Sequence, residues 1–424
     1  MARGRKRNPS DLLDGEHVRP RTAVLTRGFD PSLSVGSARP AVFRSSTYVF
    51  ESPEEAERAF SITAGRLSAD EGRRPDLIYS RLSHPNAEIL EDQLIPLEPG
   101  AKAAAVFNSG MAAIMTAFFT FGRHDSTIVY TTPLYGGTTG LIHQFLEPLR
   151  MTGVAIPAGD TKGLHKAIRA AKNCSIVYIE TPANPTLIMT DIEGAVKEAH
   201  AHADAPVVMV DNTFLGPVFQ HPLKLGADLT LYSATKYLCG FSDILAGVAL
   251  AADPALIQRM RSRRGMFGNI LQPDECWILD SRLPTVQLRM NRQSKNAQRI
   301  AEQLHANKAA RKHLREVIYP TLFVNAEQKR IYAKQCDFPG GILSLDFKGG
   351  KPAAFEFLRR CKIARNAVSL GGVETLACHP KTTTHSSMSV QELAESGVTD
   401  GLVRISVGIE DWRDLLADFL QAIQ

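Results

Sequence analysis

Short apolar runs alternate with helix-like segments from about residue 76 to residue 280, and this alternation constrains the fold most strongly. The runs AAAVF (103–107), STIVYTT (126–132) and CSIVYIE (174–180) are apolar at nearly every position, and helical character follows each of them. Strands that are apolar throughout belong to sheets that helices cover on both faces, as in parallel sheets. We therefore predict an α/β protein whose large domain holds a mostly parallel sheet.

The rest of the chain predicts two further parts beside this large domain, which we assign to residues 76–280. Residues 1–75 are rich in Pro, Gly and Ser and lack the apolar content of an independent core, so we expect an extended arm on another domain or subunit. Residues 281–424 begin with a long helix-like stretch and continue with mixed strands and helices. This order predicts a smaller C-terminal α+β domain.

Composition limits the class of protein. The chain has 424 residues, of which 44% are hydrophobic and 22% charged, as in an ordinary globular enzyme. Its net charge of +5 is only mildly basic. The six cysteines form no CxxC pair, which indicates reduced thiols in a cytoplasmic protein. No apolar run of about 18 residues predicts a transmembrane helix, and the charged start of the chain is interpreted as a flexible leader.

A run of arginines raises the alternative of a nucleic-acid-binding protein on a relic of an enzyme fold. The segment QRMRSRRG (258–265) is basic, and so is the start of the chain. However, no aromatic residues lie among these arginines, and no nucleic-acid-reading motif accompanies them. A solvated or inter-subunit face is the simpler interpretation, and we expect no nucleic-acid partner. The arginines are Arg259, Arg261, Arg263 and Arg264.

The segment CHPKTTTH (378–385) holds three side chains of metal-ligating type, Cys378, His379 and His385. A closed structural zinc site needs four ligands, and no further ligand follows these three at zinc spacing. We therefore expect no metal ion and interpret the cluster as incidental.

Polar and glycine residues follow the predicted strands, at the place where open α/β sheets bind their ligands. A glycine opens a helix after the first strand, and the free amides of a helix start suit a phosphate. An aromatic ring, an amide and a carboxylate follow three later strands, and two hydroxyls and an amine follow another. The residues are Gly110, Met111, Tyr135, Asn184, Asp211, Ser233, Thr235 and Lys236.

Together these groups meet the needs of pyridoxal 5′-phosphate (PLP). The amine of Lys236 can condense with the aldehyde of PLP. Asp211 can keep the pyridine nitrogen protonated, so that the ring accepts electrons. The ring of Tyr135 can stack on the cofactor, and the amide of Asn184 can reach its ring hydroxyl. The candidates for holding the phosphate are Gly110, Met111, Ser233 and Thr235.

The segment SATKYLCGFSD (233–243) resembles the PLP signature of the Cys/Met-metabolism, or trans-sulfuration, enzymes. This family includes cystathionine γ-synthases, cystathionine γ- and β-lyases, methionine γ-lyases and O-acylhomoserine sulfhydrylases. Further segments resemble the family's other blocks in the same order, over about residues 20–424. They are IYSRLSHPN, NSGMAAI, PLYGGT, ETPANP, VDNTF, SLGGVETLACHP and VRISVGIED.

The resemblance implies a fold, an assembly and several residue roles. The fold is that of the type I aminotransferases, with a mostly parallel seven-stranded sheet, and the assembly is a tetramer made of two dimers. Tyr79 and Arg81 would reach the cofactor phosphate of a neighbouring subunit. Arg404 would bind the substrate α-carboxylate through its planar guanidinium. Ser369 would help to place that carboxylate or Lys236.

The same resemblance implies the catalytic chemistry. Lys236 would remove the Cα proton of the amino-acid substrate. Tyr135 would protonate or activate the group on Cγ in the step in which that group leaves. Two positions and one segment depart from the family pattern, and the segment is DSRLPTVQLRM (280–290), which replaces the commoner RGLKTLxLRM run. Phe241 stands where a His is usual, and we interpret it as adjusting the shape of the site beside the cofactor. Gly137 stands where methionine γ-lyases carry Cys and sulfhydrylases often carry Gly, and we expect it to enlarge the space beside Tyr135.

Val368 bears on the choice of substrate. Enzymes of the family that act on cystathionine resemble one another in carrying Glu there, and β-lyases carry Tyr. An apolar side chain cannot pair the distal ammonium of cystathionine, so it favours methionine or an O-acylhomoserine. We predict γ-elimination on L-methionine or a related homoserine-derived amino acid, giving 2-oxobutanoate, ammonia and a thiol. γ-Replacement by a synthase or sulfhydrylase is the alternative, and cystathionine γ- or β-lyase activity is less expected.

Overall fold

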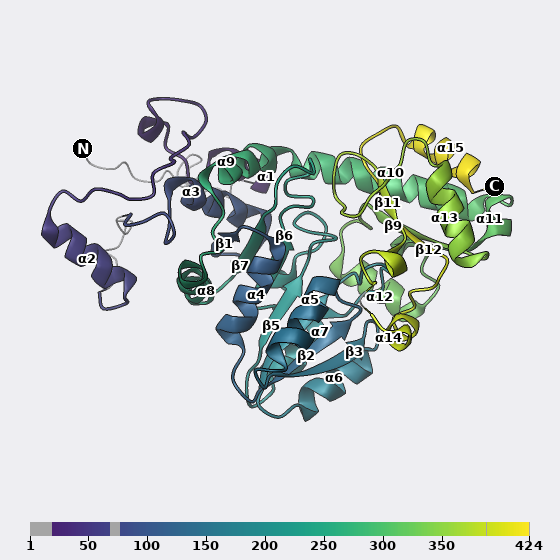
Figure 1. Cartoon of the computed structure of the whole chain (residues 1–424), viewed down its shortest axis with the longest axis horizontal. Helices are drawn as coiled ribbons and strands as arrows, with labels where there is room; N and C mark the ends of the chain where they lie inside the picture. Colours follow the sequence, from purple (N-terminus) through teal and green to yellow (C-terminus); the bar gives the residue numbers. More distant parts are fainter. Residues whose placement is uncertain (1–18, 68–76, 387, 424) are drawn as a thin grey trace.

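The computed structural model of the chain describes residues 19–67, 77–386 and 388–423. The predicted basic leader lies outside these residues, as does part of the predicted arm, 68–76. The described residues form a seven-stranded and a five-stranded sheet with a long helix between them in the chain (Figure 1). None of the described helices is long and apolar enough to cross a lipid bilayer.

The larger sheet confirms the predicted α/β fold with a mainly parallel sheet. Its strand order is β1-β7-β6-β5-β4-β2-β3, and only β7 runs antiparallel to its neighbours. The strands are β1 (Ala103–Phe107), β2 (Thr127–Thr132), β3 (Thr152–Pro157), β4 (Cys174–Glu180), β5 (Val207–Asp211), β6 (Leu229–Ser233) and β7 (Gly247–Ala251).

Helices cover both faces of this sheet, which explains why its strands are apolar at nearly every position. Tyr178 of β4 packs on one face against α4, whereas its neighbour Val177 packs on the other against α7. The first face carries α4 (Gly110–Phe121), α5 (Gly136–Leu141) and α8 (Pro254–Phe267). The second carries α3 (Pro85–Leu94), α6 (Thr161–Ala170), α7 (Ile192–His200) and α9 (Pro273–Arg282).

The C-terminal part is a smaller α+β unit, as predicted. Helix α10 (Val286–Ala306) leads into a sheet of order β10-β11-β12-β9-β8, in which all pairs except β10 and β11 are antiparallel. Its strands are β8 (Leu314–Ile318), β9 (Ile342–Phe347), β10 (Arg365–Asn366), β11 (Leu376–Cys378) and β12 (Leu402–Ser406). Its other helices are α11 (Ala310–His313), α12 (Ala326–Gln335), α13 (Gly350–Arg360), α14 (Val390–Glu395) and α15 (Trp412–Ala422).

The described part of the N-terminal arm holds little regular structure. Two helices lie in it, α1 (Pro20–Thr26) and α2 (Pro53–Thr63), and Figure 1 shows α2 far from both sheets. The arm lies along α9 of its own chain, because Arg44 pairs with Asp274 at 2.6 Å and Trp277 donates to the carbonyl of Pro40 at 2.9 Å.

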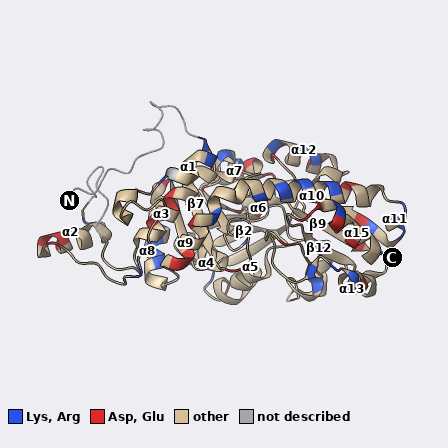
Figure 2. Ribbon diagram, turned by 90° about the horizontal axis from the view of Figure 1, so that it is seen from above, with Lys and Arg blue, Asp and Glu red and all other residues tan. Residues whose placement is uncertain are grey.

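The arginines of segment 258–265 mostly serve the fold. They lie on α8, where Arg264 and Arg261 both pair with the buried Glu91, at 2.6 and 2.7 Å. Arg259 donates to the carbonyl of Thr120 at 3.0 Å. The interpretation as a solvated or inter-subunit face was therefore wrong for Arg264, which is buried, whereas Arg259 is exposed and Arg261 is half-buried. Figure 2 shows Lys and Arg on α8 and on elements across the structure as far as α11, at the end opposite α2.

Candidate active site

Strands β4, β5 and β6 are neighbours in the sheet and run in the same direction, so the turns after them share one edge. Their last residues are Glu180, Asp211 and Ser233. Lys236 follows β6, and Asn184 follows β4. The structure therefore brings four predicted site residues together with Glu180 at the carboxyl edge of the sheet, namely Asn184, Asp211, Ser233 and Lys236.

The amine of Lys236 is held at this edge by a contact from the C-terminal part. Its Nζ donates to Ser369 Oγ at 2.9 Å. Burial, and next the positive charge of Arg404, lower the pKa of Lys236 to about 8. A lysine in this state carries a sizeable neutral fraction near neutral pH, which suits a nucleophile or base.

The turn after Lys236 is anchored by Arg289 of α10. Its Nη1 donates to the carbonyl of Tyr237 at 2.7 Å, and its Nη2 to that of Leu238 at 3.2 Å. A Cβ at Gly240 would lie 2.0 Å from Arg289 Nη1, so this close approach requires glycine. The ring of Phe241 lies within 5.6 Å of the Arg289 guanidinium. The departure from His at 241 therefore supplies a flat apolar surface beside that cation.

Arg404 of β12 presents a buried cation to the site. Its side chain is about 3% exposed, yet no carboxylate of the described residues pairs with it within salt-bridge distance. Nη1 donates to Asn184 Oδ1 at 3.1 Å, Nη2 donates to the carbonyl of Ser369 at 2.8 Å, and Nε has no partner. A buried guanidinium without a counter-ion is suited to bind an anion.

Two buried carboxyl groups lie opposite each other in the pairing of β4 with β5, Glu180 and Asp211. Burial raises the pKa of both, and the charge of Asp211 raises that of Glu180 further. Asp211 accepts from the N–H of Thr213 at 3.0 Å and the hydroxyl of Tyr178 at 3.4 Å. The environment of Asp211 thus provides two donors for its ionised form.

Tyr135 precedes α5, and its side chain is 46% exposed at the site. The expectation that Gly137 leaves open space beside it was wrong. A Cβ at Gly137 would lie 2.7 Å from Tyr135 Cε1 and 2.9 Å from Met111 Sδ. The tyrosine ring and the methionine fill this space, so Gly137 lets the ring lie close to the backbone.

The predicted phosphate donors also lie at this edge. Gly110 is the first residue of α4, and a Cβ there would lie 2.9 Å from Ser233 Cβ. The helix start can therefore pack directly beside Ser233. The hydroxyl of Thr235 exchanges hydrogen bonds with both backbone groups of Ala246, at 3.3 and 3.0 Å. Its donor is thus engaged with the backbone in this structure.

Tyr79 and Arg81 lie apart from the other predicted site residues. Arg81 donates to the carbonyl of Gly265 on α8 and lies over the Tyr79 ring at 5.7 Å. The contacts of the described residues join neither of them to Lys236, Asp211 or Ser233. Tyr79 is 43% exposed, so its ring is available to another molecule.

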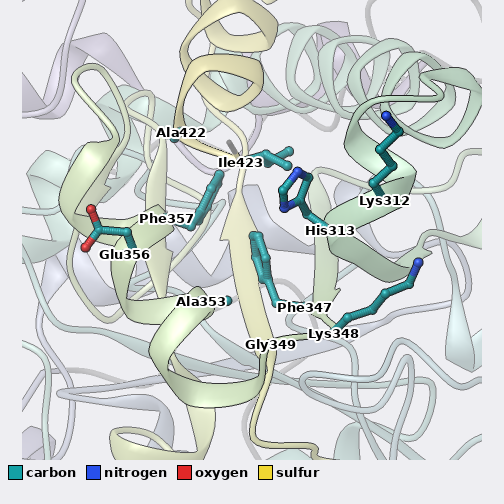
Figure 3. Close-up of a pocket in the computed structure, with 10 residues that line it drawn as sticks. All are labelled: Lys312, His313, Phe347, Lys348, Gly349, Ala353, Glu356, Phe357, Ala422 and Ile423. Carbon is teal, nitrogen blue, oxygen red and sulfur yellow. The ribbon is translucent and has the colours of Figure 1, made fainter.

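A cavity of about 280 Å³ opens in the C-terminal part and holds none of the predicted site residues (Figure 3). The rings of Phe347 and Phe357 line it, whereas the amines of Lys312 and Lys348 point away from it. In the described ranges, no three His, Cys, Asp or Glu side chains come together in a way that could hold a metal ion.

Sequence reasoning missed three residues that support the site, Glu180, Arg289 and His385. Glu180 gave a signal, because an acid ending an all-apolar strand is unusual. His385 was considered only as a metal ligand, but its Nε2 lies 3.0 Å from the carbonyl of Asn184. Burial lowers the pKa of His385 to about 4, so it is neutral there. Arg289 gave no signal, since nothing local shows where a helix docks.

Comparisons with known proteins place this site in a family. The sequence profile of the Cys/Met metabolism PLP-dependent enzymes matches residues 21–424. The chain belongs to this family. An L-methionine gamma-lyase of Pseudomonas deceptionensis is 35% identical over 405 residues, which cover 95% of this chain and 96% of that protein.

Other members of the family are comparably similar to this PLP enzyme. A cystathionine beta-lyase of Bacillus subtilis is 36% identical over 346 residues, covering 82% of this chain and 86% of that protein. A solved cystathionine gamma synthase of Xanthomonas oryzae pv. oryzae, in complex with aminoacrylate and cysteine, superimposes with a TM-score of 0.85 at 29% identity. That match covers 96% of this chain and 98% of the other.

The site has the groups that PLP requires. Lys236 supplies an amine whose pKa is lowered to about 8, as condensation with an aldehyde needs. Asp211 supplies a buried carboxyl group that two donors support in its ionised form. The start of α4 beside Ser233 supplies backbone N–H groups for a phosphate. The residues therefore fit the cofactor of the family.

Proposed function

We propose that this protein is a PLP-dependent carbon–sulfur lyase that performs γ-elimination on L-methionine or a related homoserine-derived amino acid. The products are 2-oxobutanoate, ammonia and a thiol. Lys236 would carry the cofactor, Asp211 would face its pyridine nitrogen, and Tyr135 would lie on its ring. Asn184 would reach the ring hydroxyl. The phosphate would be held by Gly110, Met111, Ser233 and Thr235.

The substrate would be oriented by its α-carboxylate. Arg404 is buried, has an unpartnered Nε and lacks a carboxylate partner among the described residues, which supports its role as the carboxylate-binding group. Ser369 connects this group to Lys236, because its carbonyl accepts from Arg404 and its Oγ from Lys236. A carboxylate bound here would place Cα within reach of the lysine amine.

The protons would be moved by the protein's own side chains. PLP, when bound, withdraws electrons from Cα and so makes its proton removable. The neutral amine of Lys236 would take that proton, and its lowered pKa supports this use. Tyr135, exposed at the site, would protonate or activate the sulfur-bearing group as it leaves Cγ.

The observation that carries the choice of substrate is the place of Val368. It directly precedes Ser369, the residue that contacts both Lys236 and Arg404, and its side chain is 53% exposed. An uncharged side chain at this position offers no partner to the distal ammonium of cystathionine. It supports a substrate with an uncharged tail, which agrees with the methionine gamma-lyases among the relatives.

γ-Replacement on an O-acylhomoserine is the alternative, because it also uses a substrate with an uncharged tail. The decisive assay is a panel of L-methionine, L-cystathionine, L-homocysteine and O-acetyl- and O-succinyl-homoserine, each with and without cysteine or sulfide. Release of 2-oxobutanoate and a thiol from methionine alone supports the lyase. A product that needs both an acylhomoserine and a thiol overturns it in favour of a synthase. Faster turnover of cystathionine than of methionine contradicts the role of Val368.

The proposal extends to assembly and location. Tyr79 and Arg81 would serve the active site of a neighbouring subunit in a homotetramer made of two dimers, and their separation from Lys236 in one chain supports this. The six cysteines are all unpaired, which supports a reducing, cytoplasmic location.

A further inference from the structure

We propose that Glu180 is a positioning residue of the active site, whose buried carboxyl group holds the turn that carries Tyr135. The inference rests on the proposed function, because Tyr135 matters here as the ring that lies on the cofactor. Glu180 itself would touch neither cofactor nor substrate.

The contact that carries the inference joins two turns of the sheet edge. Glu180 Oε2 accepts from the backbone N–H of Tyr135 at 2.8 Å. The backbone of Asn184 also lies within hydrogen-bonding reach of the same carboxyl group. One side chain at the end of β4 thus connects the turn after β2 with the turn after β4. Both turns carry residues of the proposed cofactor site.

Both backbone groups of Tyr135 are bonded: its N–H donates to Glu180, and its carbonyl accepts from the N–H groups of Thr138 and Thr139, at 2.8 and 3.1 Å. Two glycines follow Tyr135, and its side chain forms no capping bond with α5. In the described part of the chain, the Tyr135 hydroxyl makes no hydrogen bond. The direction of the ring therefore depends on the backbone of the turn, and the bond to Glu180 restrains that backbone.

The energetic cost of burying Glu180 without a Lys or Arg partner also points to a functional role. Glu180 is about 5% exposed, and no Lys or Arg of the described residues forms a salt bridge with it. Glu91, a comparably buried acid, is paired with Arg264 at 2.6 Å. The charged and titratable groups that face Glu180 are Asp211, Tyr178 and Arg404. A buried acid beside a second acid is costly for the fold, and such costs are typical of functional sites.

The neighbouring Asp211 determines which form of Glu180 is needed. Two adjacent buried carboxyl groups do not readily ionise together. Asp211 has donors from Thr213 and Tyr178, whereas burial together with the charge of Asp211 raises the pKa of Glu180 to about 8. We therefore assign the negative charge to Asp211 and the proton to Glu180. A protonated carboxyl group still has an oxygen that accepts the Tyr135 N–H. Glutamine has the same shape and the same acceptor, so it should replace Glu180 in this role.

The test is a double-mutant cycle on cofactor binding. The dissociation constant of PLP is measured from the visible absorption of the bound cofactor in four proteins. They are the wild type, Glu180→Ala, Tyr135→Ala and the double variant. We expect E180A to weaken binding about tenfold when Tyr135 is present, as for one lost hydrogen bond to a polarised group, and to have little effect in the Tyr135→Ala background. Glu180→Gln should bind within about twofold of wild type.

Glu98 provides a matched control, because it is also buried and bonds to Tyr232 at 2.5 Å and to the N–H of Leu223 at 3.2 Å. Glu98→Ala should lower the thermal midpoint without changing the PLP dissociation constant. If E180A does not fold, Glu180→Asp carries the cycle, since it keeps an acid but withdraws it from the Tyr135 N–H.

The outcomes separate the two proposals. Wild-type protein that binds no PLP overturns the proposed function itself. Wild-type protein that binds PLP, with E180A binding equally well, overturns the positioning role. If E180A loses the same PLP affinity with Tyr135 present and with Tyr135→Ala, the positioning role is also overturned, because Glu180 would then act independently of Tyr135. A loss of PLP affinity in E180A that depends on Tyr135 and is absent in E180Q supports the positioning role of Glu180.

Discussion

The amine of Lys236 lies 2.9 Å from the hydroxyl of Ser369, although the two residues are 133 positions apart in the chain. Lys236 follows a strand of the seven-stranded sheet, and Ser369 lies in the C-terminal part between β10 and β11. Ser369 has a φ of 89°, which is rare for a residue other than glycine. The bond from Arg404 to its carbonyl helps to hold this conformation.

Removing the Ser369 hydroxyl tests this contact. In Ser369→Ala the lysine amine loses its acceptor, so we expect kcat to fall about five- to tenfold, as for one lost hydrogen bond. The cofactor should stay bound, because Ser369 contacts none of the proposed phosphate donors. Steady-state kinetics and the visible spectrum measure both effects. An unchanged kcat would show that Ser369 does not orient Lys236.

The pH dependence of cofactor uptake tests the state of Lys236. The pKa of its amine is lowered to about 8, by burial first and by Arg404 second. The neutral amine is the reactive form, so the rate of PLP uptake by cofactor-free protein should rise as the pH increases through about 8. Arg404→Gln removes a positive charge and should move this midpoint to higher pH. Arg404→Lys keeps the charge and should leave it near the wild-type value. A midpoint that neither variant moves would contradict the electrostatic coupling.

The packing of Tyr135 on Gly137 gives a prediction with a control in the same helix. A methyl group at 137 would overlap the tyrosine ring and Met111, so Gly137→Ala should displace the ring. We expect kcat/KM to fall between about tenfold and a hundredfold, the range for a small misplacement of a reacting group. At Gly140 a Cβ would meet only Gln144 Nε2, at 3.9 Å, so Gly140→Ala should leave kcat/KM unchanged. Equal effects of the two substitutions would mean that the helix, not the ring, is disturbed.

Much of the fold and site could be predicted because the signals were local. Apolar strands ending in polar residues indicated the sheet, its carboxyl edge and the residues gathered there. The assignment of Arg404 to the substrate α-carboxylate required the family resemblance, because a buried arginine in a strand looks structural on its own. The expectation for Gly137 was wrong because a residue without a side chain need not leave open space, and here the ring of Tyr135 occupies that space.

Other features depend on tertiary packing that no local pattern contains. The arginines on α8 pair with Glu91 of α3, and only the packing of these helices shows that they are not free. Arg289 approaches the Lys236 turn from α10, where no motif marks it. The role of Glu180 appears only when its contact with Tyr135 is known.

The assembly proposal predicts recovery of activity in mixed subunits. Arg81→Ala should weaken the hold on the cofactor phosphate, since it deletes a charge-assisted contact worth about 1.5–3 kcal/mol. Lys236→Ala should be inactive because its own site lacks the lysine that carries the cofactor. If Arg81 serves a neighbouring subunit, hybrids of the two variants contain one intact site and regain part of the activity. No recovery after verified subunit exchange would show that Arg81 and Lys236 serve the same chain's site.

The central claim, that Lys236 is the residue that carries PLP, is tested most directly by trapping the cofactor on the chain. Borohydride reduction of the PLP-loaded protein, followed by peptide mass spectrometry, locates the lysine to which the cofactor is attached. We expect the reduced cofactor on the peptide that contains Lys236, and none on that peptide in Lys236→Ala. A reduced cofactor on another lysine, or a loaded protein with no modified peptide, would contradict the claim.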